Sequence, residues 1–495
     1  MILKVSIFVL QNKKQNAMLP NKSKTIISEI QVFFTSSEKA VATLTRVISS
    51  LTISKNLFTD KVNTKYTGKN VLTLLLLFPL FQIKDASSYK KSTLYNIVNC
   101  GKDVFYRFVN DCAKDWRAIL YHINMQLIRR VEHESCAETV HNKCLIVDDT
   151  DMPKTGRRIE LIGRVFSHVT KKSILAFKGL FLCYHDGKSI YSIDYSIHGE
   201  KGKNKKKPFG MTKSALKQRY SKKRDMQSKG KGRVDEYIQS KISSMIEMVR
   251  HAIKKGIRFN YLLADSWFTC YEVVHFIKTR RIKCHFLGMI KMGKTKYSYN
   301  GQLLTSKEIA DDLRRKKKVK KSNLYKCYYS EAIVLIQDIE VKLFFCKTSR
   351  KGKWNGLLST NTELSFEEAY KIYSTRWVIE VYFKESKQHL GLGKCQSQDF
   401  DAQIAYVALC MLQYNLLSVV KRLNAYETMG ALFREIQAES LELTIAERIH
   451  QIITELMMEL AEIFDADIEM LMENFFSENE RLMKLLNYKP LMQAG

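Results

Sequence analysis

The segment Cys144-Leu-Ile-Val-Asp-Asp-Thr150 places two carboxylates directly after a short run of strand-forming residues. A brief apolar run with β-branched residues is typical of a buried strand. Side chains alternate along a strand, so only one of Asp148 and Asp149 can face a given side of a sheet. The segment therefore predicts a core strand with one carboxylate directed toward a site.

Two more carboxylates lie in comparable settings further along the chain. Asp265 ends the apolar run that starts at Tyr261, and Glu380 lies in a helical segment. On a helix of about 100° per residue, Tyr373, Arg376, Glu380 and Lys387 project at roughly 0°, −60°, −20° and −40°. One narrow face thus carries a phenol, a guanidinium, a carboxylate and an ammonium group. This grouping indicates a metal ion held beside a phosphate.

The elements around these carboxylates follow an informative order. Cys144–Asp149, Ile174–His185 and Lys188–His198 are expected to form an antiparallel meander, with Asp186-Gly187 as a hairpin turn. A helix, a strand, a helix and a strand are expected next, over Val234–Lys255, Phe259–Asp265, Ser266–Arg280 and Lys283–Ile290. This order predicts an α/β (α+β) fold with a ribonuclease H-like catalytic core.

Helical patterns flank this core, and strand patterns interrupt it. The helices before it suggest a DNA-binding region, with a plain helical cap as the alternative. The expected regions are a helical N-terminal DNA-binding region (1–135), the first part of the core (140–291), a β-rich insertion (292–362), the second part of the core (363–425) and an acidic helical C-terminal region (426–495).

Charge and cysteine content narrow the class of protein. The formal net charge is +31, from 81 Lys and Arg against 50 Asp and Glu, which favours a polyanionic partner such as nucleic acid. The 11 cysteines include no C-x-x-C pair, which argues against a zinc ribbon or a disulfide framework. The start of the chain does not resemble a signal peptide, and the apolar run Val71–Ile83 is short for a membrane span.

Positive charge is concentrated in one stretch. Residues 201–233 contain 14 Lys and Arg and are expected to form a flexible basic loop, in which Lys205, Lys206 and Lys207 contact DNA phosphates. The segment from Glu427 onward is instead acidic, and its apolar residues recur at helical spacing, which suggests a protein partner or a helical cap. Those residues are Leu432, Ile436, Leu443, Ile449, Ile452, Leu456 and Leu460.

Asp-Asp-Thr150, Ala264-Asp-Ser-Trp-Phe268 and the Y-R-E-K pattern from Tyr373 to Lys387 resemble the catalytic blocks of DDE transposases of the insertion-sequence four family. The resemblance covers residues 90–425. It implies that Asp149, Asp265 and Glu380 are the catalytic residues and metal ligands. Asp149 is favoured because the catalytic Asp of the family directly precedes Thr or Ser, and Asp148 remains the alternative.

The same chemistry suggests roles for the neighbouring residues. Phosphodiester cleavage is served by two divalent ions, and hard carboxylate oxygens favour Mg²⁺, for which Mn²⁺ can substitute. Arg376 is suited to clamp a phosphate, Lys387 to act as a point charge on the DNA end, and Tyr373 to donate a hydrogen bond to a phosphate. By resemblance to transposases that form hairpins, Trp354 is expected to stack on a flipped base, with ordinary packing as the alternative.

The resemblance implies a cut-and-paste transposase of a bacterial mobile element. Such an enzyme binds the terminal inverted repeats of its insertion sequence, cleaves the DNA ends as an endonuclease, and transfers the 3′-hydroxyl ends to target DNA, through a hairpin intermediate. A homodimer is expected in the synaptic complex, in the cytoplasm near the nucleoid, with no membrane partner. The alternatives are a catalytically silent DNA-binding repressor derived from a transposase and a stand-alone ribonuclease H-like nuclease.

Overall fold

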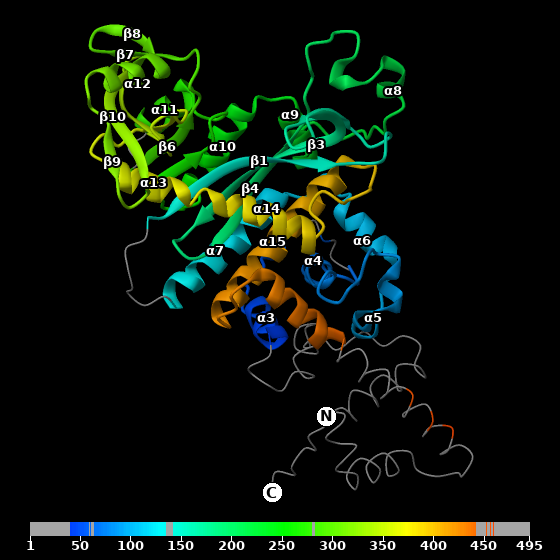
Figure 1. Cartoon of the computed structure of the whole chain (residues 1–495). Helices are drawn as coiled ribbons and strands as arrows, with labels where there is room; N and C mark the ends of the chain where they lie inside the picture. The colour runs from blue at the N-terminus through cyan, green and yellow to red at the C-terminus, as the bar shows by residue number, and fades with distance from the viewer. Residues whose placement is uncertain are drawn as a thin grey trace, which may run out of the picture. The chain divides into compact units, whose positions relative to one another are not determined.

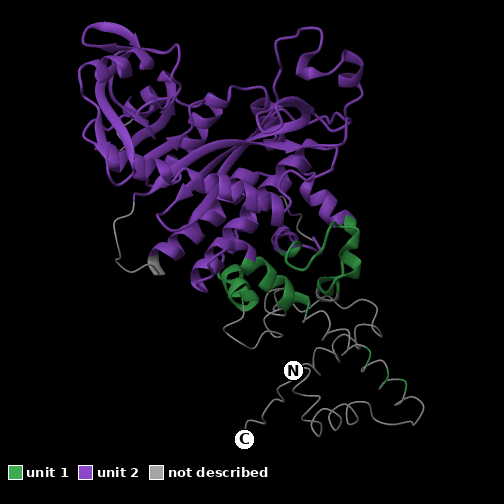
Figure 2. Ribbon diagram, in the orientation of Figure 1, with its two compact units in different colours: residues 1–50, 77–102, 431–495 green, residues 51–76, 103–430 purple. Residues whose placement is uncertain are grey.

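The computed structural model describes residues 40–58, 60, 64–134, 142–279, 283–441, 452, 456 and 459. The chain divides into two compact units, which Figure 2 shows in different colours. Unit 2 (51–76 and 103–430) contains the sheet and all of the predicted site residues. Unit 1 consists of 1–50, 77–102 and 431–495, and only its described residues are discussed.

A large mixed sheet forms the centre of unit 2, in the order β2-β3-β1-β5-β6-β12-β11-β10-β7-β8, with β4 beside β3 and β9 beside β10. Figure 1 shows the helices of unit 2 that lie against this sheet, among them α10 (Lys241–Lys254) and α14 (Trp377–His389). The strands are β1 (Cys144–Pro153), β2 (Gly163–Ser167), β3 (Lys172–His185), β4 (Ile190–His198), β5 (Tyr261–Ala264), β6 (His285–Ile290), β7 (Lys296–Tyr299), β8 (Gln302–Thr305), β9 (Lys320–Ser322), β10 (Cys327–Ile336), β11 (Ile339–Lys347) and β12 (Asn355–Ser359).

Five of these strands carry the predicted meander and the strands that follow it. β1 pairs antiparallel with β3, and β3 pairs antiparallel with β4. The turn between β3 and β4 is the expected one, with Gly187 at a φ of 100° and a hydrogen bond from Asp186 N to Ser189 O. On the other side of β1, β5 and then β6 pair in parallel. The short strand β2, which also pairs with β3, was not predicted.

The strands expected in the insertion do not form a separate sheet. β12 pairs antiparallel with β6, and β11 and β10 follow in order. The predicted β-rich insertion (292–362) includes β10, β11 and β12. The insertion therefore extends the central sheet, a non-local pairing that strand periodicity does not reveal.

Within the described residues, the labelled helices are α3 (Ala40–Ser49), α4 (Gly68–Leu77), α5 (Thr93–Ile97), α6 (Lys102–Val109), α7 (Trp116–Glu134), α8 (Lys213–Lys217), α9 (Lys229–Tyr237), α10 (Lys241–Lys254), α11 (Tyr271–Thr279), α12 (Ser306–Arg315), α13 (Phe366–Ser374), α14 (Trp377–His389) and α15 (Phe400–Leu423). The single helix expected over 234–255 is two helices, because Ser240 caps α10 through Ile242 N. The helix expected over 266–280 begins at Tyr271.

α14 and α15 cover the face of the sheet that carries Phe181. The Phe181 ring lies 6.0 Å from Tyr382 and 5.3 Å from Phe383, both on α14, and the Tyr195 hydroxyl donates to Ile404 O on α15 at 2.7 Å. By length and composition α15 could cross a membrane, yet 94% of its most apolar window is buried in the protein. α15 is therefore the core helix of unit 2.

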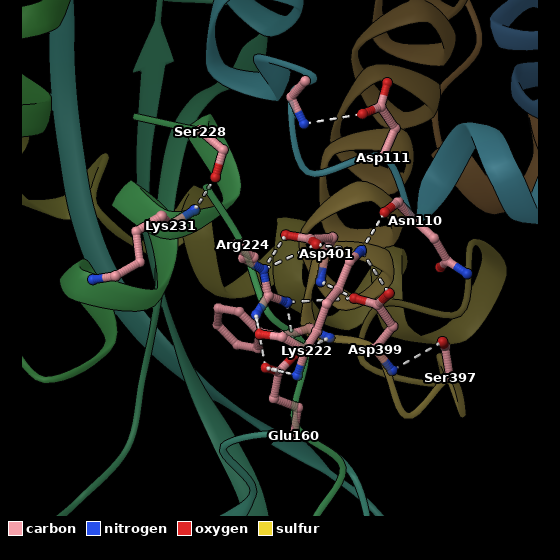
Figure 3. A network of polar contacts seen from close by, with 12 residues as sticks. Asn110, Asp111, Glu160, Lys222, Arg224, Ser228, Lys231, Ser397, Asp399 and Asp401 are labelled. Carbon is pink, nitrogen blue, oxygen red and sulfur yellow. Dashed lines mark hydrogen bonds and ion pairs between the residues drawn. The ribbon is translucent and has the colours of Figure 1, made fainter. Parts of the chain in front are cut away.

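The basic stretch 201–233 is folded, contrary to the expected flexible loop. It contains a short 3-10 turn over Pro208–Gly210, α8, and the start of α9. A buried ion-pair cluster anchors its second half (Figure 3). Arg224 forms two hydrogen bonds to Glu160, at 2.7 and 2.6 Å, and its Nε donates to both carboxylate oxygens of Asp401, at 3.2 and 3.0 Å. Lys222 contacts Asp401 at 2.8 Å and Asp399 at 2.9 Å.

In unit 1, residues 431–441 are helical, and Leu432 and Ile436 are fully buried. The Glu439 carboxylate accepts hydrogen bonds from the backbone N–H groups of Ala40 and Val41, at 3.0 and 2.7 Å, at the start of α3. A carboxylate at that position stabilises a helix N-terminus. Most of the acidic tail lies outside the described residues, including Leu443, Ile449 and Leu460.

Candidate active site

Asp148 and Asp265 lie at the same level on neighbouring parallel strands. Val147 of β1 pairs with Ala264, the last residue of β5, so the two aspartates follow directly after this pair. Residues paired in register point to the same side of a sheet. The Asp265 carboxylate also contributes to the raised pKa of Asp148, as expected for groups on neighbouring strands.

Arg376 connects Asp148 to Glu380. Its Nη1 lies 3.0 Å from Asp148 Oδ2, and its Nη2 lies 2.5 Å from Glu380 Oε1. The side chains of Asp148 and Arg376 are 18% and 16% exposed, whereas that of Glu380 is 35% exposed. Arg376 therefore joins Asp148 of β1 to Glu380 of α14, and Asp265 directly follows the neighbouring strand β5.

The helix that carries this pattern is interrupted, although its face is preserved. Tyr373 belongs to α13, Arg376 precedes α14, and the two helices meet through i→i+3 hydrogen bonds such as Arg376 N to Tyr373 O at 2.9 Å. Thr375 and Arg376 keep helical dihedral angles. The backbone winds more tightly at the junction but keeps its helical direction. The side chains of the pattern therefore stay on one side across the junction.

The surroundings of the Asp148 carboxyl group disfavour its ionised form. Burial raises the pKa of Asp148 to about 7, Arg376 opposes the rise, and the Asp265 carboxylate adds to it. A buried carboxyl group near a second carboxylate resists ionisation unless a cation joins them. The local electrostatics therefore favour binding of an additional positive charge.

Asp149 does not join this group, which differs from the expectation that it faces the site. It forms an ion pair with Lys241, the first residue of α10. Side chains alternate along β1, so Asp149 points to the opposite face from Asp148. The alternative residue, Asp148, is the one that the structure brings together with Asp265 and Glu380.

Tyr373 and Lys387 lie at the edges of the region that contains the predicted carboxylates. The Arg376 guanidinium carbon is 5.9 Å from the centre of the Tyr373 ring, and burial raises the pKa of Tyr373 to about 12. Lys387 Nζ donates to Thr150 Oγ1 at 2.7 Å, two residues along β1 from Asp148. The structure thus places all four residues of the Y-R-E-K pattern along one side of β1.

The remaining predicted DNA contacts lie apart from this group. Trp354 is half-buried just before β12, with Lys347 Nζ 4.5 Å from its ring centre. Lys205, Lys206 and Lys207 are exposed in the first half of the basic stretch. They are accessible to a polyanion, unlike Lys222 and Arg224 in the buried cluster.

Sequence reasoning did not predict the exposure of two tryptophans that lie close in the chain to the carboxylates. Trp267 follows Asp265 by two residues and is 43% exposed, and Trp377 precedes Glu380 by three residues and is 62% exposed. The available signal was their position, because each lies within one helical turn or less of a predicted carboxylate.

The donor set is suited to a divalent metal ion. Carboxylate oxygens are the hard ligands that Mg²⁺ prefers, and a bound cation would favour the ionised form of Asp148, whose pKa is raised mainly by burial. As they stand, no three His, Cys, Asp or Glu side chains in the described parts of the chain are arranged to hold a metal ion. Arg376 instead contacts Asp148 and Glu380.

Comparison with known proteins identifies the class of this domain. Residues 239–416 match the family model described as a transposase DDE domain, and residues 92–286 match that of a DDE superfamily endonuclease. The middle of the chain is thus similar to domains of the DDE transposase and endonuclease type. No curated protein sequence matches the chain.

Two solved structures show distant likeness. A cryo-EM structure of the piggyBac transposase synaptic complex with hairpin DNA is 14% identical, covering 88% of this chain and 83% of that chain at a TM-score of 0.41. The crystal structure of the NurA nuclease from Sulfolobus solfataricus is 11% identical, covering 55% of this chain and 84% of that chain at a TM-score of 0.23.

Proposed function

We propose that this protein is a transposase of the insertion-sequence four type that cleaves and joins DNA ends. The observation that carries the proposal is the convergence of Asp148, Asp265 and Glu380 around Arg376 within a DDE-type domain. The strand order β4-β3-β1-β5-β6, with its first pairings antiparallel and its last two parallel, supports a ribonuclease H-like core.

In this proposal the three carboxylates hold Mg²⁺, for which Mn²⁺ can substitute. Divalent ions bound there would activate an oxygen nucleophile and neutralise charge on the phosphate under attack. Asp148 takes the place expected for Asp149, because Asp148 is the residue near Asp265 and Arg376. Arg376 would release its carboxylate partners and clamp the phosphate with parallel N–H donors.

The other named residues would position DNA. Lys387, held by Thr150, supplies a point charge beside the site, and Tyr373 supplies a hydroxyl next to Arg376. Lys205, Lys206 and Lys207 would contact backbone phosphates without reading bases. The net charge of +31 supports a DNA partner. Three further features are proposed from the resemblance of the motifs. They are recognition of terminal inverted repeats, a hairpin intermediate and a homodimer in the synaptic complex.

The test is a strand-transfer assay on DNA that carries the sequences flanking the reading frame. With Mg²⁺, the wild-type protein should nick the ends and join the 3′-hydroxyls to a target plasmid. Nicking without joining would indicate a stand-alone nuclease, and end binding without nicking would indicate a repressor. Native gels with two labelled ends would show whether a dimer pairs them. Nicking without joining, or end binding without nicking, would contradict the proposed transposase function.

A further inference from the structure

The Arg376 guanidinium lies between two of the proposed metal ligands. Its Nη1 is 3.0 Å from Asp148 Oδ2, and its Nη2 is 2.5 Å from Glu380 Oε1. Two nitrogens of one planar group therefore contact carboxylates from two different elements, because Asp148 belongs to β1 and Glu380 to α14. A divalent ion that joins these two carboxylates has to take the place of the guanidinium, since like charges repel each other.

Arg376 neutralises only part of the negative charge in this region. Asp148, Glu380 and Asp265, which directly follows the neighbouring strand β5, carry three negative charges when they are ionised, and the guanidinium supplies one positive charge. The remaining negative charge attracts a divalent ion, whereas the guanidinium repels it and occupies oxygens that it needs. Arg376 and a divalent ion are therefore competitors for the same carboxylates.

The guanidinium can leave the carboxylates without unwinding of the helices. Arg376 has helical dihedral angles (φ −54°, ψ −30°), its N–H donates to Tyr373 O at 2.9 Å, and its carbonyl oxygen accepts from Ile379 N at 3.2 Å. These hydrogen bonds fix the backbone but not the arginine side chain, which changes rotamer about single bonds. The Glu380 side chain is 35% exposed, so the guanidinium that contacts it lies next to solvent.

We propose that Arg376 is an internal competitor of the divalent ion, so that a DNA phosphate controls metal binding. This inference rests on the proposed function and concerns regulation of the same site. In the free protein the guanidinium occupies Asp148 and Glu380, and a divalent ion binds them weakly. A phosphate offers the guanidinium two oxygens for parallel N–H donors. Once the guanidinium has moved to the phosphate, both carboxylates are available to the ion.

This coupling has to act in both directions. If a phosphate raises the affinity for the ion by some factor, the ion raises the affinity for the phosphate by the same factor. The free protein therefore holds few divalent ions at Asp148 and Glu380, and the metal site is completed on bound DNA.

A purely structural role for Arg376 predicts the opposite direction of change. In that case the two contacts only fasten α14 to β1, which lie against each other (Figure 1). Removing the guanidinium would then loosen Glu380, and the affinity for a divalent ion would fall or stay unchanged. Competition requires instead that this affinity rise. The direction of the change therefore distinguishes the two roles.

The first experiment titrates the full-length protein with Mn²⁺ in the absence of DNA and follows the electron paramagnetic resonance signal of the free ion. Arg376→Gln should bind Mn²⁺ about fivefold to 150-fold more tightly than the wild type, the range typical of coupled sites. Arg376→Lys keeps the charge but has a single ammonium group, so its affinity should lie between the two. The control Lys384→Gln removes an exposed positive charge from the same helix and should change the affinity less than about threefold.

The second experiment repeats the titration with a duplex that carries the sequence flanking the reading frame. In the wild type, this DNA should raise the affinity for Mn²⁺ by about fivefold or more. In Arg376→Gln the same DNA should raise it less, because no guanidinium has to move. A titration of the duplex alone corrects for ions that bind DNA. A thermal melt of each variant confirms folding, and Arg376→Lys carries the comparison if Arg376→Gln does not fold.

The outcomes separate this inference from the proposed function. If the wild-type protein nicks and joins DNA ends but Arg376→Gln binds Mn²⁺ no more tightly than the wild type, only the competition is overturned. A wild-type affinity for Mn²⁺ that DNA leaves unchanged overturns the control by phosphate in the same way. If Arg376→Gln binds Mn²⁺ more tightly but the wild type does not cut DNA, the competition is supported and the proposed transposase function fails.

Discussion

Asp148 and Asp149 are consecutive residues whose side chains leave β1 on opposite faces. Asp148 lies 3.0 Å from Arg376, and Asp149 forms an ion pair with Lys241. The two partners come from different parts of the chain, before α14 and at the start of α10. The alternation of a strand thus assigns one carboxylate to the proposed metal site and the other to a lysine.

This difference between Asp148 and Asp149 predicts that replacing each with Asn affects DNA cleavage to a different extent. Asp148→Asn should reduce Mg²⁺-dependent cleavage at least a hundredfold, as should Asp265→Asn and Glu380→Gln, because each removes a proposed metal ligand. Asp149→Asn should keep cleavage of paired DNA within about tenfold of the wild type. Nicking of end-containing DNA measures both. Full activity of Asp148→Asn with an inactive Asp149→Asn would restore the assignment expected from the sequence.

Sequence patterns predicted the positions of the helices and strands better than they predicted which residues contact one another. The β3–β4 hairpin was predicted because Asp186-Gly187 lies between two alternating strands, and turn chemistry is local. The family resemblance favoured Asp149 over Asp148, but strand alternation only separates the two side chains and does not show which face is functional. That decision depends on Arg376 and Lys241, each far from β1 in sequence.

The same limit explains why the basic stretch 201–233 was wrongly predicted to be a flexible loop. Its lysine and glycine content suggested a flexible loop, yet Arg224 finds its partners in Glu160 and Asp401, which are 64 and 177 residues away. Composition records the charges but not the long-range ion pairs that bury some of them. Likewise, strand periodicity identified β12, while its pairing with β6 required the tertiary structure.

The exposed lysines at 205–207 should contribute salt-dependent, sequence-independent DNA affinity. Replacing all three with Gln should reduce the slope of log K against log salt by about 0.9 for each lost phosphate contact. Cognate and unrelated duplexes should be affected equally, as measured by fluorescence anisotropy over a salt series. Replacement with Arg preserves the charge and should preserve the slope. A loss confined to cognate ends would indicate base reading instead.

The cluster around Arg224 should be important for stability. The side chains of Arg224, Glu160 and Asp401 are 3%, 7% and 4% exposed. Removing one member of a buried ion pair leaves a buried charge without its partner and typically costs about 3–5 kcal/mol. Arg224→Met should therefore lower the urea unfolding midpoint markedly. Lys231→Met removes an exposed pair with Asp235 and should change the free energy of unfolding by less than about 1 kcal/mol.

His198 should make stability fall in mild acid. It is 2% exposed, its Nε2 lies 2.7 Å from Ser196 Oγ, and burial lowers its pKa to about 4. In the unfolded chain a histidine takes up a proton near pH 6.5. The unfolded state therefore binds more protons between about pH 6.5 and 4, so stability is present above this window and is lost as the pH falls through it.

The expected loss from this histidine is on the order of 3 kcal/mol between pH 6.5 and 4. Urea unfolding at several pH values measures it, and the comparison variant is His198→Gln, which keeps a polar group near Ser196 but does not titrate. The variant should be less stable than the wild type at pH 7, and its stability should fall less steeply below pH 6.5. Parallel curves for the two proteins would show that His198 is already protonated in the folded state, or that its burial has no influence on acid unfolding.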